Sequence, residues 1–381
     1  MQRPSIGGYQ LPSLSVAVFS IVAGLFSIFN AAYLWSRFRD PAGSDFSRFY
    51  VAAKVGLTYG WGRIYDLSLP ELPKPRSLGG TSSPYLGPPS LAWFVSPLTA
   101  LTYDWAFAVW TVMLVGLSIA ACLLLSQGRS TSWRILAFLS AIGFTPFALA
   151  LGLQQVTVLV LTLTVLGWWL LTNDRPLWAG AILAVALSLK PQLLSLAPVA
   201  LLLSGQKRAI IAGATVTCAV TLVSLVGLGW SGINQYRAAV LVTYADHGSY
   251  LALDTLIGTF GTVAGVALTA AVVGLVGWAG RLTRNRPELS LAAGLAGSLL
   301  ITTYVILYDF TSLLVAAGLI MRTRPPSIIK GILGGAITLC VLHNLLLPLP
   351  AGLIADALVL LAVTLWAKRT PSPAPSYNRP L

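Results

Sequence analysis

An acidic residue begins an amphipathic segment that follows the first long apolar run of the chain. Asp45 precedes Phe46, Phe49, Tyr50 and Ala53, whose i, i+3, i+4, i+7 spacing places them on one face of a helix. As the residue before a helix, Asp45 could cap it by accepting hydrogen bonds from backbone N–H groups. As a carboxylate beside an apolar face, it could instead take a proton from a hydroxyl group, which is general-base catalysis.

Lys190 is a second residue that could do chemistry, because it is a lone cation between two apolar segments. It lies in the run Leu189-Lys190-Pro191-Gln192. A lysine at the end of a membrane helix can extend its stem along the helix until its ammonium reaches water. It can also neutralise a phosphate that is attached to a lipid, and we favour this second role.

The elements that must position these residues are membrane helices. Of the 381 residues, 56% are hydrophobic and only 9% are charged, whereas soluble domains carry about 25% charged residues. So few charges cannot cover a surface that faces water, and lipid must therefore cover most of this one. The three cysteines, Cys122, Cys218 and Cys340, lie inside apolar runs, and their spacing predicts neither a disulfide nor a metal site.

The apolar runs predict about twelve transmembrane helices, since a helix needs about 20 residues to cross a bilayer. The segment 86–103 is also apolar, but Pro88, Pro89 and Pro97 interrupt it. We predict that it lies at the outer interface and belongs, with residues 36–85, to a first outer loop. The predicted spans are residues 11–35, 104–126, 134–151, 155–172, 177–189, 192–204, 209–229, 254–280, 289–307, 310–321, 328–347 and 351–367.

The charges predict which side of the membrane each loop faces. The formal net charge is +13, and with both termini inside most Lys and Arg residues fall in cytoplasmic segments, as the positive-inside rule requires. The basic excess therefore reflects topology, not a nucleic-acid-binding surface.

Most Asp and Glu residues fall on the outer side. A transporter or lipid flippase, the first alternative, more often has ionisable groups near the midplane. A non-catalytic scaffold, the second alternative, would not need its acidic residues on one side of the membrane.

As an ordered set, the polar motifs resemble those of the polyprenol-phosphate-mannose-dependent α-mannosyltransferases of glycosyltransferase family 87, in the GT-C superfamily. The resemblance covers roughly residues 40–210. The residues that carry it are Asp45-Phe46, Tyr50, Ala52-Ala53, Gly62, Ile64-Tyr65-Asp66, Tyr85, Pro88-Pro89, Pro97-Leu98, Trp110, Gln155 and Leu189-Lys190-Pro191-Gln192.

Two departures from the family pattern lie within these motifs. Two residues separate Tyr85 from Pro88-Pro89, where the family usually has none. Gln154 replaces the glycine that the family places before the residue equivalent to Gln155.

The resemblance implies an all-α polytopic membrane protein, a GT-C-like bundle of about twelve transmembrane helices with an outer loop of amphipathic helices. Residues 1–367 would form a single GT-C-type transmembrane domain, with 36–103 as the first outer loop carrying interfacial helices. Residues 368–381 would be a disordered cytoplasmic tail. The protein would be a multi-pass protein of a bacterial cytoplasmic (inner) membrane, with its active site on the periplasmic or extracellular side.

The implied reaction is an inverting transfer of a sugar, by default mannose, from a polyprenyl-phosphate donor to a lipid or glycan acceptor. The alternative within this class is the same reaction with another lipid-linked sugar, such as galacturonic acid or arabinose. A monophosphate donor carries less charge than a nucleotide diphosphate, so we expect neither a metal ion nor a cofactor. Membrane lipids are the other expected partners, and nucleic acid is not one.

The resemblance also implies roles for individual residues. Asp45 would be the catalytic base that takes the proton of the acceptor hydroxyl. Lys190 is the first candidate for binding the donor phosphate, and Arg63 and His247 are second candidates. The segment 86–103 would help admit the polyprenyl chain. The residues expected to line the sugar and acceptor pocket are Tyr50, Lys54, Tyr85, Gln155, Gln192, Tyr308 and Asp309.

Overall fold

The fold is known from a computed structural model that describes most of the chain. Within the described part, the architecture is built from α-helices, which confirms the all-α prediction. A short antiparallel ladder between β1 (Ser5–Ile6) and β2 (Tyr9–Gln10) precedes them. Of the predicted tail 368–381, Lys368 and Arg369 belong to the last helix instead of a disordered segment, and residues 370–381 lie outside the described residues. The described residues are 5–6, 9–10, 14–41, 43–73, 84–247, 262–302, 305–346 and 351–369.

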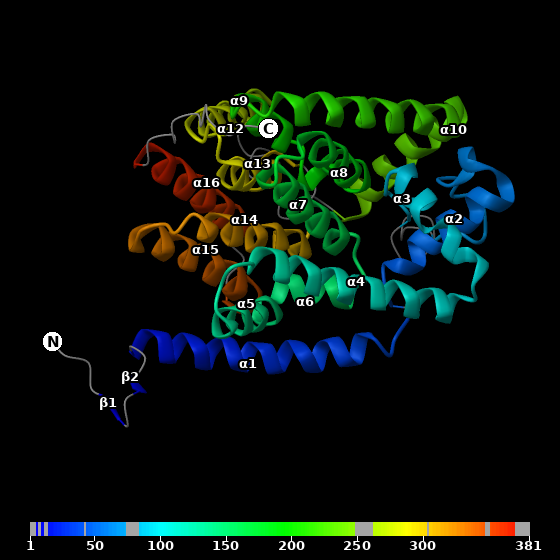
Figure 1. Ribbon diagram of the computed structural model, residues 1–381. Helices are drawn as coiled ribbons and strands as arrows, with labels where there is room; N and C mark the ends of the chain where they lie inside the picture. Colours follow the sequence, from blue (N-terminus) through cyan, green and yellow to red (C-terminus); the bar gives the residue numbers. More distant parts are fainter. Residues whose placement is uncertain are drawn as a thin grey trace.

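The helices pack into one bundle whose long members run roughly side by side (Figure 1). The longer helices are α1 (Leu14–Arg37), α2 (Phe46–Tyr59), α4 (Tyr103–Leu125), α5 (Thr131–Gly143), α7 (Thr157–Thr172), α8 (Pro176–Leu189), α10 (Lys207–His247), α12 (Thr262–Leu282), α13 (Pro287–Ile301), α14 (Thr311–Arg322), α15 (Ser327–Leu346) and α16 (Ala351–Arg369). The short ones are η1 (Trp61–Arg63), α3 (Pro89–Val95), η3 (Ser96–Ala100), α6 (Thr145–Gly152), η4 (Pro191–Leu193), α9 (Ala197–Leu203) and η5 (Leu307–Phe310).

Three of the described helices are long and apolar enough to cross a bilayer by themselves. They are Tyr103–Leu125, Lys207–Val242 within α10, and Gly265–Leu282 within α12. The bent pair of α6 and α7 would be a fourth if the two helices form one span. Several other apolar helices are shorter than a span needs. The count of twelve spans therefore stays a prediction.

Predicted spans differ in places from the helices that the structure shows. The run 134–151 is divided between α5 and α6, because Pro146 lies in the first turn of a new helix and cannot continue the previous one. The run 192–204 holds only η4 and the seven-residue α9. A continuous apolar run shows that a segment is buried in lipid or protein, but it does not show where the helix axis turns.

The segment predicted to be the first outer loop has the helices that the sequence predicts. In α2, the apolar face of Phe46, Phe49, Tyr50 and Ala53 is buried, as the helical spacing indicated. The segment 86–103 contains α3 and η3, and neither is long enough to cross a bilayer. In Figure 1 these elements lie together with the kinked part of α10 at one end of the bundle.

The kink in α10 falls where the sequence predicts the end of a span. Gly229 has φ 59° and ψ −179°, a backbone conformation that favours glycine because it has no Cβ. Beyond this kink, the ring of Tyr236 lies 4.9 Å from that of Tyr65 in the first outer loop. The bent half of α10 therefore packs over the loop that carries the candidate site residues.

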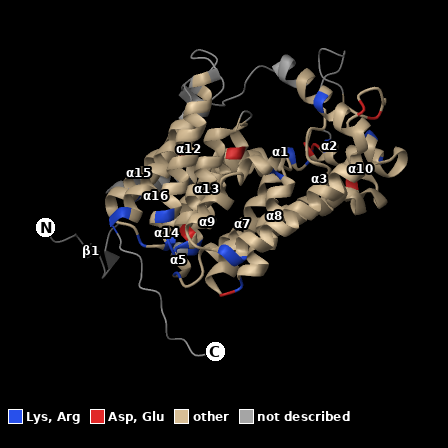
Figure 2. Cartoon of the chain, turned by 90° about the horizontal axis from the view of Figure 1, so that it is seen from above, with Lys and Arg blue, Asp and Glu red and all other residues tan. Residues whose placement is uncertain are grey.

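Charged residues lie toward the ends of the helices and in the connections, which leaves long uncharged stretches between them (Figure 2). Polar contacts also join segments that are predicted to be cytoplasmic. Arg129 donates from Nη2 to the carbonyl of Met321 at 3.0 Å. Trp366 donates from Nε1 to Oγ1 of Thr323 at 2.8 Å. These contacts agree with the predicted grouping of loops, while the direction of the bundle in the membrane stays a prediction.

Candidate active site

A break between α6 and α7 forms the centre of the candidate site. The two helices differ in direction by 116° across residues 153–156. Buried backbone that leaves a helix is stable only if other protein groups satisfy its hydrogen bonds. Here the carbonyl of Leu153 accepts a hydrogen bond from the backbone N–H of Asp45 at 2.9 Å. The carbonyl of Gln154 accepts one from Nε1 of Trp110 at 3.1 Å.

The contacts of Gln154 show how this chain accommodates a residue other than the glycine of the family pattern. Its φ is +60°, in the left-handed region that non-glycine residues adopt at a cost. Its buried side chain compensates, because Oε1 accepts a hydrogen bond from Thr111 at 3.2 Å and Nε2 donates to the carbonyl of Leu151 at 3.0 Å. The glycine that the family places here would adopt this conformation without strain.

Asp45 lies before the first turn of α2, but its carboxylate does not cap the helix. The side chain makes no capping hydrogen bond. Instead, one carboxylate oxygen pairs with Nη1 of Arg48, and the other accepts a hydrogen bond from Nε2 of Gln155. Asp45 is 8% exposed. The capping interpretation is therefore wrong, and the carboxylate is held against the break between α6 and α7.

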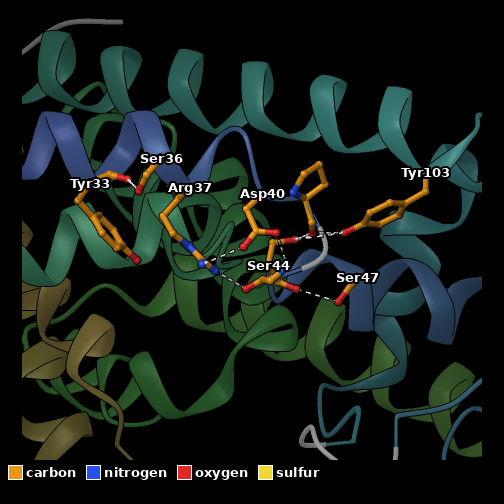
Figure 3. Close-up of polar contacts among 9 residues, drawn as sticks. Tyr33, Ser36, Arg37, Asp40, Ser44, Ser47 and Tyr103 are labelled. Atoms are coloured by element: carbon orange, nitrogen blue, oxygen red, sulfur yellow. Dashed lines mark hydrogen bonds and ion pairs between the residues drawn. The ribbon is translucent and has the colours of Figure 1, made fainter.

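A polar network fixes the turn that precedes Asp45 (Figure 3). The Arg37 guanidinium contacts the carbonyl of Gly43 and, at 3.3 Å, the carboxylate of Asp40. The hydroxyl of Tyr103, at the start of α4, donates to the carbonyl of Pro41 at 2.7 Å. The hydroxyl of Ser44 also donates to this carbonyl, at 2.8 Å. Because α1, α4 and the turn are joined in this way, the start of α2 has a defined position.

Aromatic packing holds the buried face of α2 in place beneath the carboxylate. The ring of Phe46 stacks on that of Trp110 with centroids 5.2 Å apart, and on that of Tyr103 at 6.0 Å. Trp110 is the same residue that donates to the carbonyl of Gln154. One indole therefore connects α2 to the break between α6 and α7.

Lys190 lies at the end of α8 and is buried, with 6% of its surface exposed. Its ammonium donates to Oγ1 of Thr157 at 2.7 Å and to Oδ1 of Asp309 at 2.5 Å. The ring of Tyr308 lies 4.6 Å from the ammonium nitrogen. A lysine that extends to water would expose its ammonium, so this interpretation of Lys190 is wrong. Asp309 is 1% exposed and also accepts a hydrogen bond from the backbone of Ile306 at 3.2 Å.

Both ion pairs contact residues at the same break. Gln155 contacts Asp45, and two positions later Thr157, the first residue of α7, contacts Lys190. Three interruptions of helix therefore meet here: the break between α6 and α7, the end of α8, and the segment that leads into η5. Irregular backbone of this kind is typical of buried binding sites in membrane proteins.

The tyrosines of residues 36–103 make contacts that stabilise the fold. The hydroxyl of Tyr50 donates to the carbonyl of Leu101 at 2.8 Å. Tyr85 stacks on Tyr65 with centroids 5.7 Å apart, and its hydroxyl donates to the carbonyl of Pro88 at 2.6 Å, which the two inserted residues allow. Burial raises the pKa of Tyr65 and of Tyr85 well above the usual value, so both phenols stay protonated.

The remaining predicted residues lie around these contacts. Arg63 is bound to Asp66 by Nη2 at 2.7 Å, and hydrogen bonds from Ser68 and from Arg63 lower the pKa of the Asp66 carboxyl. Lys54 is exposed on α2. The carbonyl of Gln192 accepts a hydrogen bond from Oγ1 of Thr302 at 3.3 Å. His247 ends α10, and its side chain lies outside the described residues.

The sequence interpretation missed two residues that contact the candidate site residues. Arg48 is paired with Asp45 at the i,i+3 spacing at which helical residues face one another, and this spacing could have identified it. Thr157 gave no comparable signal, because a threonine in an apolar run is common in membrane helices.

Comparison with known proteins agrees with this description of the chain. The sequence model of glycosyltransferase family 87 matches residues 85–307, which is more than half of the chain. The matched residues include Gln155 and Lys190, whereas Asp45 and Asp309 lie outside them. No curated protein and no solved structure matches this chain. The chain therefore belongs to glycosyltransferase family 87, and it is a membrane glycosyltransferase that acts on a sugar donor and an acceptor.

Proposed function

We propose that the protein transfers a sugar, by default mannose, from a polyprenyl-phosphate donor to a hydroxyl of a lipid or glycan acceptor. The reaction would take place on the outer face of the membrane and invert the configuration at the anomeric carbon. The observation that carries this proposal is the carboxylate of Asp45, buried and directed at a helix break beside a second ion pair. A glycosyl transfer needs a base of this kind beside a site for an anion.

Asp45 is the proposed base. Its two oxygens contact Arg48 and Gln155, and each oxygen of an ionised carboxylate has a second lone pair with which to accept a proton. As the acceptor oxygen bonds to the anomeric carbon, its proton passes to Asp45. The bond between that carbon and the phosphate oxygen breaks, and the phosphate leaves with the electron pair. A leaving phosphate needs a neighbouring positive charge, not a proton.

Lys190 remains the first proposed cation for that phosphate. An ammonium has three N–H donors, and Thr157 and Asp309 accept two of them. The third could contact a phosphate oxygen, or the phosphate could replace Asp309. Arg63 and His247 remain second candidates, although Arg63 already pairs with Asp66.

An apolar cavity supports a lipid-linked donor. It has a volume of about 470 Å³ and is lined by residues of α1, α4, α5, α6, α7, α14 and α15. Val158 lines it next to Thr157, and Thr311 lines it two residues after Asp309. Both lining residues are close in sequence to contacts of the Lys190–Asp309 pair, and we propose that the prenyl chain of a donor continues from this pair into the cavity.

The test is a transfer assay with purified full-length protein in detergent. Radiolabelled polyprenyl-phosphate mannose is the donor, and a membrane lipid extract is the acceptor. We expect transfer by the wild type and a fall of about 10²-fold or more in Asp45→Asn, which keeps the size of the side chain but loses the proton acceptor. Parallel reactions with galacturonic acid and arabinose donors identify the sugar. Equal rates for the wild type and Asp45→Asn would contradict the proposed base.

A further inference from the structure

We propose that Arg48 is a second residue that binds the donor phosphate, and that its guanidinium bridges this phosphate and the carboxylate of Asp45. The proposal rests on the proposed function, because it assigns a group of the donor to one side chain. Arg48 lies in the first turn of α2, and its Nη1 already pairs with Oδ1 of Asp45.

The exposure of the two partners indicates which of them can reach a ligand. The side chain of Arg48 is 31% exposed, whereas that of Asp45 is 12% exposed. A guanidinium has five N–H donors in a planar fork, and the pair with Asp45 uses a single nitrogen. In the described part of the chain, Nε and Nη2 of Arg48 make no hydrogen bond. This planar edge matches the spacing of two phosphate oxygens.

Fewer nitrogens are free of hydrogen bonds in Lys190 and Arg63, the other described cations proposed for the phosphate. Lys190 is 6% exposed and donates to both Asp309 and Thr157. Arg63 uses Nε and Nη2 for the single carboxylate of Asp66. A phosphate that binds Lys190 has a single N–H left to contact, and one that binds Arg63 has only Nη1 without a hydrogen bond in the described part of the chain. At Arg48 it can bind while the contact with Asp45 remains.

The geometry of an inverting displacement supports a bridging cation. The acceptor oxygen, the anomeric carbon and the leaving oxygen lie in line, so only the reacting centre separates the base from the phosphate. Reacting atoms are about 3–3.5 Å apart before the bond forms. A guanidinium that contacts the base is therefore within reach of the phosphate. Arg48 would hold the leaving group where its charge increases and keep the carboxylate of Asp45 facing the acceptor.

A simpler role must be separated from this one. Arg48 could only position the carboxylate of Asp45, in which case its loss would lower kcat but would not change the affinity for a lipid phosphate. The discriminating ligand is polyprenyl phosphate without a sugar, because its binding involves no proton transfer. The discriminating background is Asp45→Asn, in which a residue that only positions the carboxylate has nothing left to position.

The experiment measures the Kd of sugar-free polyprenyl phosphate for full-length protein in detergent. The variants are Arg48→Gln, Arg48→Lys, Asp45→Asn and Asp45→Asn with Arg48→Gln. Hydrogen bonds to a charged group are worth about 1.5–3 kcal/mol, so we expect Arg48→Gln to weaken binding by about tenfold or more. Arg48→Lys should weaken it less, because the charge remains. Arg48→Gln should weaken it by a similar factor in the Asp45→Asn background.

Arg39→Gln is the matched control, because Arg39 is an exposed arginine near the same turn, 4.2 Å from the ring of Trp35. It should bind polyprenyl phosphate as the wild type does, and thermal unfolding should show that all variants are folded. Unchanged Kd values in Arg48→Gln, with a lower kcat, would overturn the proposal and leave the proposed function intact. A wild type that transfers no sugar from any lipid-linked donor would instead overturn the proposed function, and the role of Arg48 with it.

Discussion

Gln155 donates a hydrogen bond from its side-chain amide to the carboxylate of Asp45, across 110 positions of the sequence. Gln155 can do this because the chain leaves α6 at residue 153 and changes direction by 116° before α7 begins. If α6 continued without the break, Gln155 would lie one helical turn further along the apolar surface of α6. The helix break is therefore what brings an amide donor to the candidate base.

The first prediction concerns this amide. Gln155→Glu has nearly the same shape but brings a second carboxylate into contact with Asp45. Two carboxylates in contact do not both ionise at neutral pH, and they share a proton. Sugar transfer at pH 7 should therefore fall by about tenfold or more, and the activity should recover as the pH is raised. The measurement is the pH dependence of kcat for the wild type and the variant.

The control for this prediction is Gln155→Ala, which removes the amide without adding a charge. It should lower kcat at all pH values and leave the shape of the pH profile unchanged, because no second carboxylate is present. If Gln155→Glu and Gln155→Ala have the same pH profile, Gln155 does not contact the base in the active enzyme.

Local features of the fold were predictable from the sequence. The spacing of Phe46, Phe49 and Tyr50 identified the buried face of α2, because helical periodicity depends only on near neighbours in the chain. The prolines in 86–103 indicated correctly that this segment is not a long helix. The division of 134–151 into two helices could have been inferred from Pro146, but the 116° bend that follows could not.

The contacts of the candidate site were not predictable in the same way. Lys190 and Asp309 are 119 positions apart and both have apolar neighbours, so periodicity gives no indication that they form a pair. Asp45 was identified as a candidate because it begins an amphipathic helix, and Lys190 because it is a lone cation between apolar segments. Which carboxylate each cation contacts depends on the packing of helices that are distant in sequence.

The second prediction concerns the strained backbone at Gln154. Gln154→Gly relieves a left-handed conformation that costs about 1–2 kcal/mol, but it loses the contacts with Thr111 and Leu151. These effects should nearly cancel, so stability and activity should stay close to those of the wild type. Gln154→Val should be strongly destabilising, because a β-branched residue does not fit a positive φ. Thermal unfolding and sugar transfer are the measurements, and a fully active Gln154→Val would contradict the argument.

The third prediction concerns topology and follows from the distribution of basic residues. In a variant without native cysteines, a cysteine at Ser68 should react from outside intact cells with an impermeant thiol reagent. Cysteines at Ser130 and Ser327 should react only after the membrane is opened. All three positions are exposed in the structure, so differences in labelling will report the side of the membrane. Labelling of Ser130→Cys in intact cells would show that the predicted orientation is wrong.

The last prediction concerns the buried pair of Lys190 and Asp309. Lys190→Met leaves the carboxylate of Asp309 buried without its cation, and removing one partner of a buried pair costs about 3–5 kcal/mol. The melting temperature in detergent should therefore fall strongly. Combining Lys190→Met with Asp309→Asn removes both charges and should restore most of the stability. Lys207→Met is the control. Lys207 is exposed at the start of α10, so its loss should not change the melting temperature.

The same double variant separates the two roles that Lys190 can have. If the ammonium only joins α8 to η5, the restored fold should regain the wild-type KM for the polyprenyl-phosphate donor. If the ammonium also contacts the donor phosphate, stability should return while the donor KM stays raised, because neither new side chain has a positive charge. We expect the second result, and a double variant with wild-type stability and wild-type donor KM would show that Lys190 is a structural residue.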